Sequence, residues 1–318
     1  MKLIAQFNGL ENAVLPPAPL HLAIGMFDGA HLGHRAVIEA AVQSAHRGGG
    51  VAAVLTFAPH PSTLFRPEQP TRLIMDATTK ARVLHRLGVD AMITQPFTPE
   101  FASVAAEEFL PWLKARAPRL AAVYVGENFR FGRGRKGDLA LLVAEGRKLG
   151  VTVFSAPRVN FDGEPISSTR IRGLLESGDV AAANALLGYS YMTEGPVVPG
   201  KRMGRTIGFP TLNVAWAPDL RPRYGVYVVR VSGAKSVTAL PGVANYGLRP
   251  TVEEAVEPRL EVHVLGDCPF GPGDAVTVKW LRFLRPEAKF ANVDELRAQI
   301  ARDRDAAAES FAKPKDQQ

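Results

Sequence analysis

The pattern of the sequence changes once, near residue 188, and this change limits the folds that the chain can adopt. Before that point, strand-like and helix-like runs alternate, which predicts a parallel sheet with helices on both faces. After it, strand-like runs are separated by turns rich in Gly and Pro, which predicts an antiparallel barrel or sandwich. A last helix begins near Asn292. We therefore expect an α/β domain over 1–187 and a β domain over 188–318.

The expected elements of the first domain follow from apolar periodicity and from glycines that end helices. Strands are expected at 20–25, 51–57, 89–94, 121–126 and 151–155, with helices at 31–47, 78–87, 103–117 and 138–149. Open parallel sheets bind ligands at the carboxyl ends of their strands. The segments 25–34, 56–61 and 126–137 fall at these ends, so we expect the site among them.

The first of these segments reads Gly-Met-Phe-Asp-Gly-Ala-His-Leu-Gly-His, from Gly25 to His34, and it joins a strand to a helix. The N-terminus of a helix carries unpaired backbone N–H groups and the positive end of the dipole, so it attracts phosphate. Histidine side chains can donate hydrogen bonds to phosphate oxygens, and glycine lets the backbone approach a ligand closely. The segment therefore predicts a nucleotide phosphate site.

The charge of the chain agrees with an anionic partner. Its 38 Lys and Arg against 31 Asp and Glu give a net charge of +7, which suits nucleic acid, nucleotides or phosphorylated small molecules. Two loops that contain glycine hold clusters of basic residues, namely Arg130, Arg133, Arg135 and Lys136, then Lys201, Arg202 and Arg205. This pattern favours phosphate pockets over a nucleic-acid surface. For any single one of these residues, a charge on the solvated surface is an equally good explanation.

Other features narrow the class of protein. No apolar run reaches the length of a membrane span, and no secretory signal is visible, so we expect no membrane partner. Cys268 is the only cysteine, which excludes internal disulfides and suits the cytoplasm.

Two glycine-rich motifs are similar to known nucleotide-binding motifs but do not indicate those functions here. Gly132–Gly137 fits a dinucleotide fingerprint but follows the fourth expected strand, and Gly195–Arg202 lacks the Ser or Thr of a phosphate-binding P-loop.

His31-Leu32-Gly33-His34 resembles the motif of the HxGH nucleotidyltransferases, and Ile166–Arg172 matches their second motif at the head of another helix. Thr56–Pro61 and Gly126–Gly132 are similar to segments of prokaryotic FAD synthetases. Gly204–Asn213, Gly242–Thr251, Arg259–His263 and Phe283–Phe290 are similar to riboflavin kinases. Because these segments occur in order from about residue 20 to 305, the chain is identified as a member of the bifunctional FAD synthetase family.

The resemblance implies that the first domain transfers an adenylyl group from ATP to FMN, giving FAD and pyrophosphate. It implies that His31, His34 and Arg172 act on the ATP phosphates. Further ATP contacts are expected from Gly25, Phe27, Asp28, Gly33, Ser167, Ser168 and Thr169, and flavin contacts from Phe57, Pro59, His60 and Asn128. The FMN phosphate is already ionised, so this reaction needs alignment and charge neutralisation rather than a base.

The resemblance implies that the second domain phosphorylates riboflavin with ATP, giving FMN. Glu261 matches the base that takes the proton of the riboflavin hydroxyl. Thr211 and Asn213 offer two neutral oxygens that suit Mg²⁺. Gly200, Lys201 and Gly208 belong to a glycine-rich run expected to cover the ATP phosphates.

Alternatives stay open at this point. One domain could be inactive, and Leu212, where riboflavin kinases usually have Ala, raises that question for the second domain. A flavin- or nucleic-acid-binding regulator is the alternative from another class, but it gives no reason for the spacing of the two histidines. We expect small-molecule partners only (riboflavin, FMN and ATP), no nucleic acid, and a monomer or weak oligomer.

Overall fold

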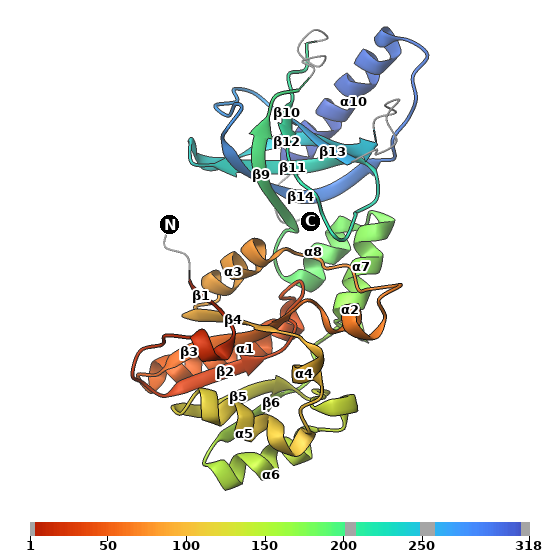
Figure 1. The fold of residues 1–318 in the computed structure, drawn as a ribbon. Coiled ribbons are helices and arrows are strands. Elements are labelled where there is room, and N and C mark those ends of the chain that lie inside the picture. Colours follow the sequence, from red (N-terminus) through yellow and green to blue (C-terminus); the bar gives the residue numbers. More distant parts are fainter. Residues whose placement is uncertain (1–3, 201–207, 249–257, 313–318) are drawn as a thin grey trace. The chain divides into compact units, whose positions relative to one another are not determined.

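A computed structural model describes residues 4–200, 208–248 and 258–312 (Figure 1). By its internal contacts the chain divides into two compact units, Met1–Ser168 and Thr169–Gln318. Each unit is described by itself below.

The first unit is built on a six-stranded sheet in the order β1-β4-β3-β2-β5-β6, and every neighbouring pair is parallel. The strands are β1 (Ala5–Asn8), β2 (Leu20–Ile24), β3 (Val51–Ala58), β4 (Ala91–Pro96), β5 (Leu120–Gly126) and β6 (Thr152–Ala156). The order runs outward in opposite directions from β2, so the sheet changes its winding between β2 and β5. In open α/β sheets a ligand site is expected at that point.

Helices cover both faces of this sheet, as the alternating pattern predicts. On one face, α1 (Leu32–Arg47) and α3 (Ala77–Arg86) bury Val37, Ile38, Ala41, Ala81 and Leu84 against the sheet. On the other face, α5 (Ala106–Arg116) and α6 (Leu139–Leu149) bury Phe109, Leu110, Leu113 and Leu142. Shorter elements complete the unit: η1 (Leu10–Asn12), α2 (Pro61–Phe65), α4 (Pro99–Ala102), η2 (Arg133–Arg135), β7 (Asn160–Phe161) and β8 (Glu164–Pro165).

Two details of this unit differ from the sequence-based expectation. The helix expected at 103–117 is α5 and begins only at Ala106, because Ser103 ends a separate short helix, α4, which Thr98 caps and which was not expected. The edge strand β1 was not expected; it pairs in parallel with β4 from Ala5 to Asn8.

The second unit is a closed barrel of six strands, in the order β10-β13-β12-β11-β14-β9. Its strands are β9 (Met192–Val198), β10 (Leu212–Val214), β11 (Gly225–Gly233), β12 (Ser236–Leu248), β13 (Pro258–Val264) and β14 (Ala275–Arg285), and all the pairs are antiparallel. Strand-like runs at 224–231, 237–244, 260–265 and 275–281 in the sequence predict the last four of these strands, whereas β9 and β10 were not predicted. The terminal helix α10 (Val293–Ala312) begins after Asn292, whose side chain accepts the N–H of Glu295, as expected.

Two further helices, α7 (Ser168–Ser177) and α8 (Val180–Leu187), also pack with the barrel. The Asn184 side chain of α8 donates to the Trp280 carbonyl at 2.8 Å, and Arg223 donates to the Ser177 carbonyl at the end of α7 at 3.2 Å. By its internal contacts the chain therefore divides after the first residue of α7, between Ser168 and Thr169, whereas 187/188 remains the predicted boundary between functional domains.

The barrel has a closed apolar interior and an outer face that α10 partly covers. Trp280, Tyr227 and Tyr246 lie fully buried inside it. The ring centroids of Tyr227 and Tyr246 lie 4.6 and 5.7 Å from that of Trp280. On the outer face, Val226, Val228 and Val243 form a cluster with Ala307 of α10. Over the ranges that the structure describes, no helix is long and apolar enough to cross a membrane.

Candidate functional site

The turn between β2 and α1 carries the first histidine motif, and its backbone has an unusual shape. Phe27 and Ala30 both adopt positive φ angles, 47° and 37°, which residues other than glycine rarely do. Phe27 is buried, and its ring leaves no spare room for a side chain at Gly25, where a Cβ would lie 3.0 Å from the tip of the ring. The turn therefore directs the chain sharply into the N-terminus of α1.

His31 and His34 lie together at this helix N-terminus. His31 is the N-cap residue, and its Nδ1 accepts the backbone N–H of His34 at 3.3 Å. The two imidazole rings stack with centroids 3.7 Å apart, and the ring of Phe27 meets His34 edge-on at 5.4 Å. A Cβ at Gly33 would lie 3.3 Å from the His31 ring, so glycine permits this close packing.

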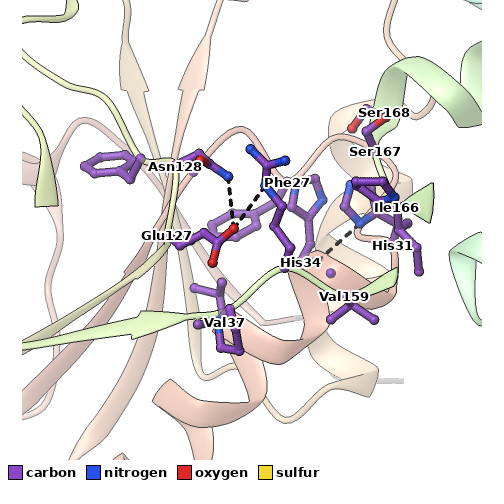
Figure 2. A pocket seen from close by; sticks show the side chains of 18 of the residues that line it. Phe27, His31, His34, Val37, Glu127, Asn128, Val159, Ile166, Ser167 and Ser168 are labelled. Atoms are coloured by element: carbon purple, nitrogen blue, oxygen red, sulfur yellow. Dashed lines mark hydrogen bonds and ion pairs between the residues drawn. The ribbon is translucent and has the colours of Figure 1, made fainter. Parts of the chain in front are cut away.

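A cavity of about 500 Å³ opens beside these rings (Figure 2). Its walls come from the carboxyl ends of β2, β5 and β6 and from the start of α1, which is the point where the sheet changes its winding. Eight of the predicted site residues line it: Gly25, Phe27, His31, Gly33, His34, Asn128, Ser167 and Ser168. Segments more than a hundred residues apart thus form one nucleotide-sized cavity.

Three other predicted residues of this site lie elsewhere. Asp28 does not line the cavity; its carboxylate, 2% exposed, accepts the Ile74 N–H at 3.0 and 3.2 Å. Thr169 and Arg172 lie in α7, which belongs to the second unit. Ser168 links to the motif turn, because its hydroxyl donates to the Asp28 carbonyl at 2.8 Å. The predicted roles of these residues remain predictions.

The cavity also contains an ion pair that the sequence analysis missed. Arg158 Nε lies 3.0 Å from Glu127 Oε1, and both residues line the cavity. Glu127 lies within the segment Gly126–Gly132 but was not predicted as a site residue, and Arg158 follows β6 with no motif around it. Its position just past the end of a predicted strand was the one available signal.

The basic loop after β5 is organised by its glycines. Phe131 and Gly137 exchange two backbone hydrogen bonds, and a Cβ at Gly137 would lie 2.6 Å from the Phe131 ring. Gly132 and Gly134 both have positive φ angles. The guanidinium of Arg130 pairs with the carboxylate of Asp138, with Nη1 and Oδ2 3.7 Å apart. The glycines that fit a dinucleotide fingerprint therefore serve the shape of a local loop rather than a strand-to-helix turn.

The predicted flavin residues other than Asn128 lie near the end of β3, outside the cavity lining. The Phe57 ring contacts Phe97 and Phe101, with centroids 6.1 and 5.6 Å away. Pro59 follows a cis peptide bond and is exposed. His60 is the N-cap of α2, where Nδ1 accepts the Ser62 N–H at 3.1 Å, so it has a structural role independent of any ligand.

In the barrel, the strand register places the predicted base beside a predicted metal ligand. Glu261 of β13 pairs with Asn213 of β10 on one side and with Asn245 of β12 on the other. Directly opposed residues of antiparallel strands share a face. The flanking residues Leu212 and Val214 are buried, so this polar row lies on the outside of the barrel. Leu212 faces the interior, away from the row.

Two neighbours define the surroundings of Thr211 and Asn213. Gly200 lies against the Asn213 amide so closely that a Cβ there would be 2.1 Å from Nδ2. His263 Nδ1 donates to the Pro210 carbonyl at 2.8 Å, which fixes the backbone just before Thr211. Gly208 is described, with φ of 88°, whereas Lys201, Arg202 and Arg205 fall outside the described residues.

The oxygen donors of this row suit Mg²⁺, which binds neutral and phosphate oxygens. Thr211 and Asn213 are each only partly buried, so a ligand has access to them. Close packing against Gly200 also holds the Asn213 side chain in place.

The fold and the two sites define a class of protein in which a nucleotide-binding α/β unit precedes a β-barrel. The model of the FAD synthetase family matches residues 16–170, and that of the riboflavin kinase family matches residues 187–311. The chain belongs to the bifunctional riboflavin kinase/FMN adenylyltransferase family.

Relatives of that description align over nearly the whole chain. The protein of Escherichia coli K12 is 38% identical over 98% of both chains, and that of Listeria monocytogenes is 37% identical over 93% of both. The Bacillus subtilis relative is 35% identical over 92% of both. A crystal structure described as a macrolide-efflux protein from Streptococcus pneumoniae superposes with a TM-score of 0.83 at 29% identity, covering 96% of this chain and 99% of the other.

Proposed function

We propose that the chain makes FMN from riboflavin and ATP in its barrel domain, and FAD and pyrophosphate from FMN and ATP in its α/β domain. We assign the FMN adenylyltransferase domain to residues 1–187 and the riboflavin kinase domain to 188–318. The observation that carries the proposal is the cavity at the winding change of the sheet, with two stacked histidines at a helix N-terminus. The family of the chain supports the same conclusion.

In the α/β domain, the α1 N-terminus, His31 and His34 bind the ATP phosphates. The N–H groups of the first helical turn and the imidazoles neutralise the charge that develops as pyrophosphate leaves. Gly25, Phe27 and Gly33 shape the wall, and Ser167 and Ser168 line the same cavity with their hydroxyl-bearing side chains. We assign Thr169 and Arg172 to the ATP phosphates as well, with the Arg172 guanidinium taking the leaving pyrophosphate. Asp28 supports the turn through Ile74.

The flavin of FMN binds beside Phe57, Pro59, His60 and Asn128. Phe57, Phe97 and Phe101 form an aromatic cluster at the end of β3. Aromatic faces favour stacking with a flat ring such as that of a flavin. Asn128 lines the cavity wall, which supports its assignment as a contact of the flavin at the nucleotide site.

In the barrel domain, Glu261 accepts the proton of the riboflavin hydroxyl as that oxygen attacks the terminal phosphate of ATP. Thr211 and Asn213 hold Mg²⁺ by their side-chain oxygens. A Mg²⁺ ion held there would supply positive charge against the transferred phosphate. Gly200, Lys201 and Gly208 lie along the chain that covers the ATP phosphates. The register pairing of Asn213 with Glu261 supports placing both functions in one site.

Riboflavin, FMN and ATP are the partners that we propose, with no nucleic acid and no membrane, and the chain acts as a monomer or weak oligomer. The single cysteine supports work in the cytoplasm. A nucleic-acid-binding regulator would instead give a salt-dependent complex with RNA or DNA.

Product analysis tests this proposal directly. Purified protein incubated with riboflavin, ATP and Mg²⁺ is expected to form FMN and then FAD, and with FMN and ATP to form FAD, as followed by chromatography. Glu261→Gln is expected to lower FMN formation by about a hundredfold or more, the range of a lost general base. The same variant is expected to form FAD from supplied FMN at the normal rate.

A matched control is Glu194→Gln, which changes another carboxylate of the barrel, one that accepts a hydrogen bond from Thr277 at 3.2 Å. It is expected to leave FMN formation unchanged. Absence of FMN with the unchanged protein would refute the kinase half of the proposal. Loss of FAD formation in folded Glu261→Gln would refute the separation of the two sites.

A further inference from the structure

The turn that carries the histidine motif has a shape that it cannot keep by itself. Phe27 and Ala30 are both in the left-handed region, with Gly29 at φ 81° between them. For residues other than glycine this conformation is strained, because Cβ comes too close to the backbone. Such a conformation persists where contacts from outside the segment hold it. The structure shows which contacts these are.

The carbonyl oxygen of Met26 is the point at which the turn is held from behind. Lys80 Nζ, from the first turn of α3, donates to this oxygen at 2.8 Å, and the Thr56 hydroxyl of β3 donates to it at 3.0 Å. Lys80 Nζ also reaches Thr56 Oγ1 at 3.3 Å, so the three groups form a closed triangle. Met26 directly precedes Phe27, the first residue with a positive φ.

Lys80 is almost entirely buried, which is rare for a lysine. Its exposed fraction is 6%, and burial lowers its pKa, while the nearby Asp28 carboxylate opposes that shift. It is absent from the set of residues that line the cavity in the described part of the chain, so it does not contact a ligand there. Burying an amino group away from the ligand is costly, and here the group's hydrogen bonds go to the motif turn and to Thr56 behind it.

Asp28, one residue beyond Phe27, fixes the other end of the same turn. Its carboxylate accepts the Ile74 N–H from the segment before α3, and its carbonyl accepts the Ser168 hydroxyl. Lys80 and Ile74 thus bring the start of α3 and the chain before it against the turn. His31 follows directly, and its ring stacks on His34.

We propose that Lys80 is a positioning residue for adenylyl transfer, which holds the Met26 carbonyl and thereby the turn that presents His31 and His34 to ATP. The inference rests on the proposed FMN adenylyltransferase function. Lys80 acts through the backbone rather than on the substrate. Its loss leaves the Met26 carbonyl with only the Thr56 hydroxyl, and the turn relaxes toward ordinary φ angles. A shift of roughly 1 Å in a group that aligns reactants can cost about a hundredfold in rate.

The test is the variant Lys80→Met in the full chain, which keeps the length and apolar stem of the side chain and removes the donor. We expect kcat for FAD formation from FMN and ATP to fall about tenfold to a hundredfold. We expect KM for ATP to change less than about threefold, because no group that touches ATP is removed. Riboflavin kinase activity of the same preparation is expected to stay normal.

The matched control is Lys114→Met. Lys114 Nζ also donates to a backbone carbonyl, that of Leu120, at 2.8 Å, but in a part of the sheet outside the motif turn. This variant removes the same kind of hydrogen bond. The rate of FAD formation is expected to stay within about twofold of that of the unchanged protein, as for a substitution away from the site. A similar loss in both variants would overturn the inference, since general destabilisation would then explain it.

Two more variants keep the inference falsifiable if Lys80→Met folds poorly. Thr56→Val removes the second donor to the Met26 carbonyl at constant volume, and we expect a severalfold loss of kcat for FAD formation. Adding Asp28→Asn to Lys80→Met removes the buried carboxylate that lost its countercharge. Restored FAD formation in this double variant would overturn the inference, because Lys80 would then serve only to neutralise Asp28.

The outcomes separate this inference from the proposed function. If the unchanged protein forms no FAD, the proposed function fails. If it forms FAD and Lys80→Met does so at the same kcat, or with a raised KM alone, the positioning role fails while the function stands.

Discussion

Replacing Gly200 by alanine is expected to damage the kinase site through Asn213. A Cβ at Gly200 would lie 2.1 Å from Asn213 Nδ2 and 2.7 Å from Cγ, whereas separations under 3.0 Å essentially never occur. The Asn213 side chain therefore has to move by roughly 1 Å, and a misplacement of that size can cost about a hundredfold in rate. We expect kcat for FMN formation in Gly200→Ala to fall by about ten- to a hundredfold.

The assay measures FMN formation from riboflavin, ATP and Mg²⁺, with FAD formation from FMN in the same preparation as the internal reference. Gly271→Ala is the matched control, since a Cβ there would meet no atom within 4 Å. It is expected to leave both activities unchanged.

A double-mutant cycle tests whether the loss passes through Asn213. If it does, Gly200→Ala adds little to Asn213→Ala, because the displaced group is already gone. Normal kinase activity in Gly200→Ala would refute the reasoning. Fully additive losses would show that Gly200 acts by another route.

Two further predictions concern histidines. His263→Phe removes the hydrogen-bond donor to the Pro210 carbonyl, an interaction worth about 1 kcal/mol, and is expected to lower FMN formation about fivefold. His263→Asn keeps a donor and is expected to retain more activity. Equal rates of FMN formation in the two variants would contradict this prediction. Burial lowers the pKa of His21, so the unfolded chain binds more protons and the wild-type protein loses stability as the pH falls below about 6.5. In His21→Phe, urea unfolding between about pH 7.5 and pH 5.5 is expected to show a smaller loss, and an equal or larger loss would exclude His21 as its source.

The first domain was predictable from the sequence because each of its signals is local. Apolar periodicity marked the strands, and Gly48, Gly88 and Gly150 marked helix ends. Gly48 and Gly150 directly follow the last residue of a helix, and Gly88 lies two residues after the last residue of α3. The edge strand β1 was missed because only one neighbour, β4, specifies it. The strands β9 and β10 were missed because short segments rich in Gly and Pro carry little periodicity.

The candidate site was predictable only in part. His31 and His34 were found because both lie in one motif with a strand before it and a helix after it. The pair Glu127 and Arg158 is formed by segments that meet only in the folded sheet, so no local pattern announces it. Lys80 did carry a signal: it occupies the same helix face as Leu84, four residues on, where a lysine breaks an otherwise apolar stripe. A buried charge in a predicted core position indicates a partner that the sequence alone does not identify.

The contents of the barrel support the position proposed for the kinase site. Trp280, Tyr227 and Tyr246 close the interior, and burial raises the pKa of both tyrosines because little water reaches them. A small barrel filled in this way has no space for a nucleotide, so a ligand has to bind outside it. On the outer face, α10 covers β11 and β12 with Ala307 and Phe311. Asn213 and Glu261 lie on the neighbouring strands β10 and β13, where half-buried polar side chains replace that apolar cluster. The alternation of inward and outward residues that builds the apolar core therefore also sets the predicted base and metal ligand side by side.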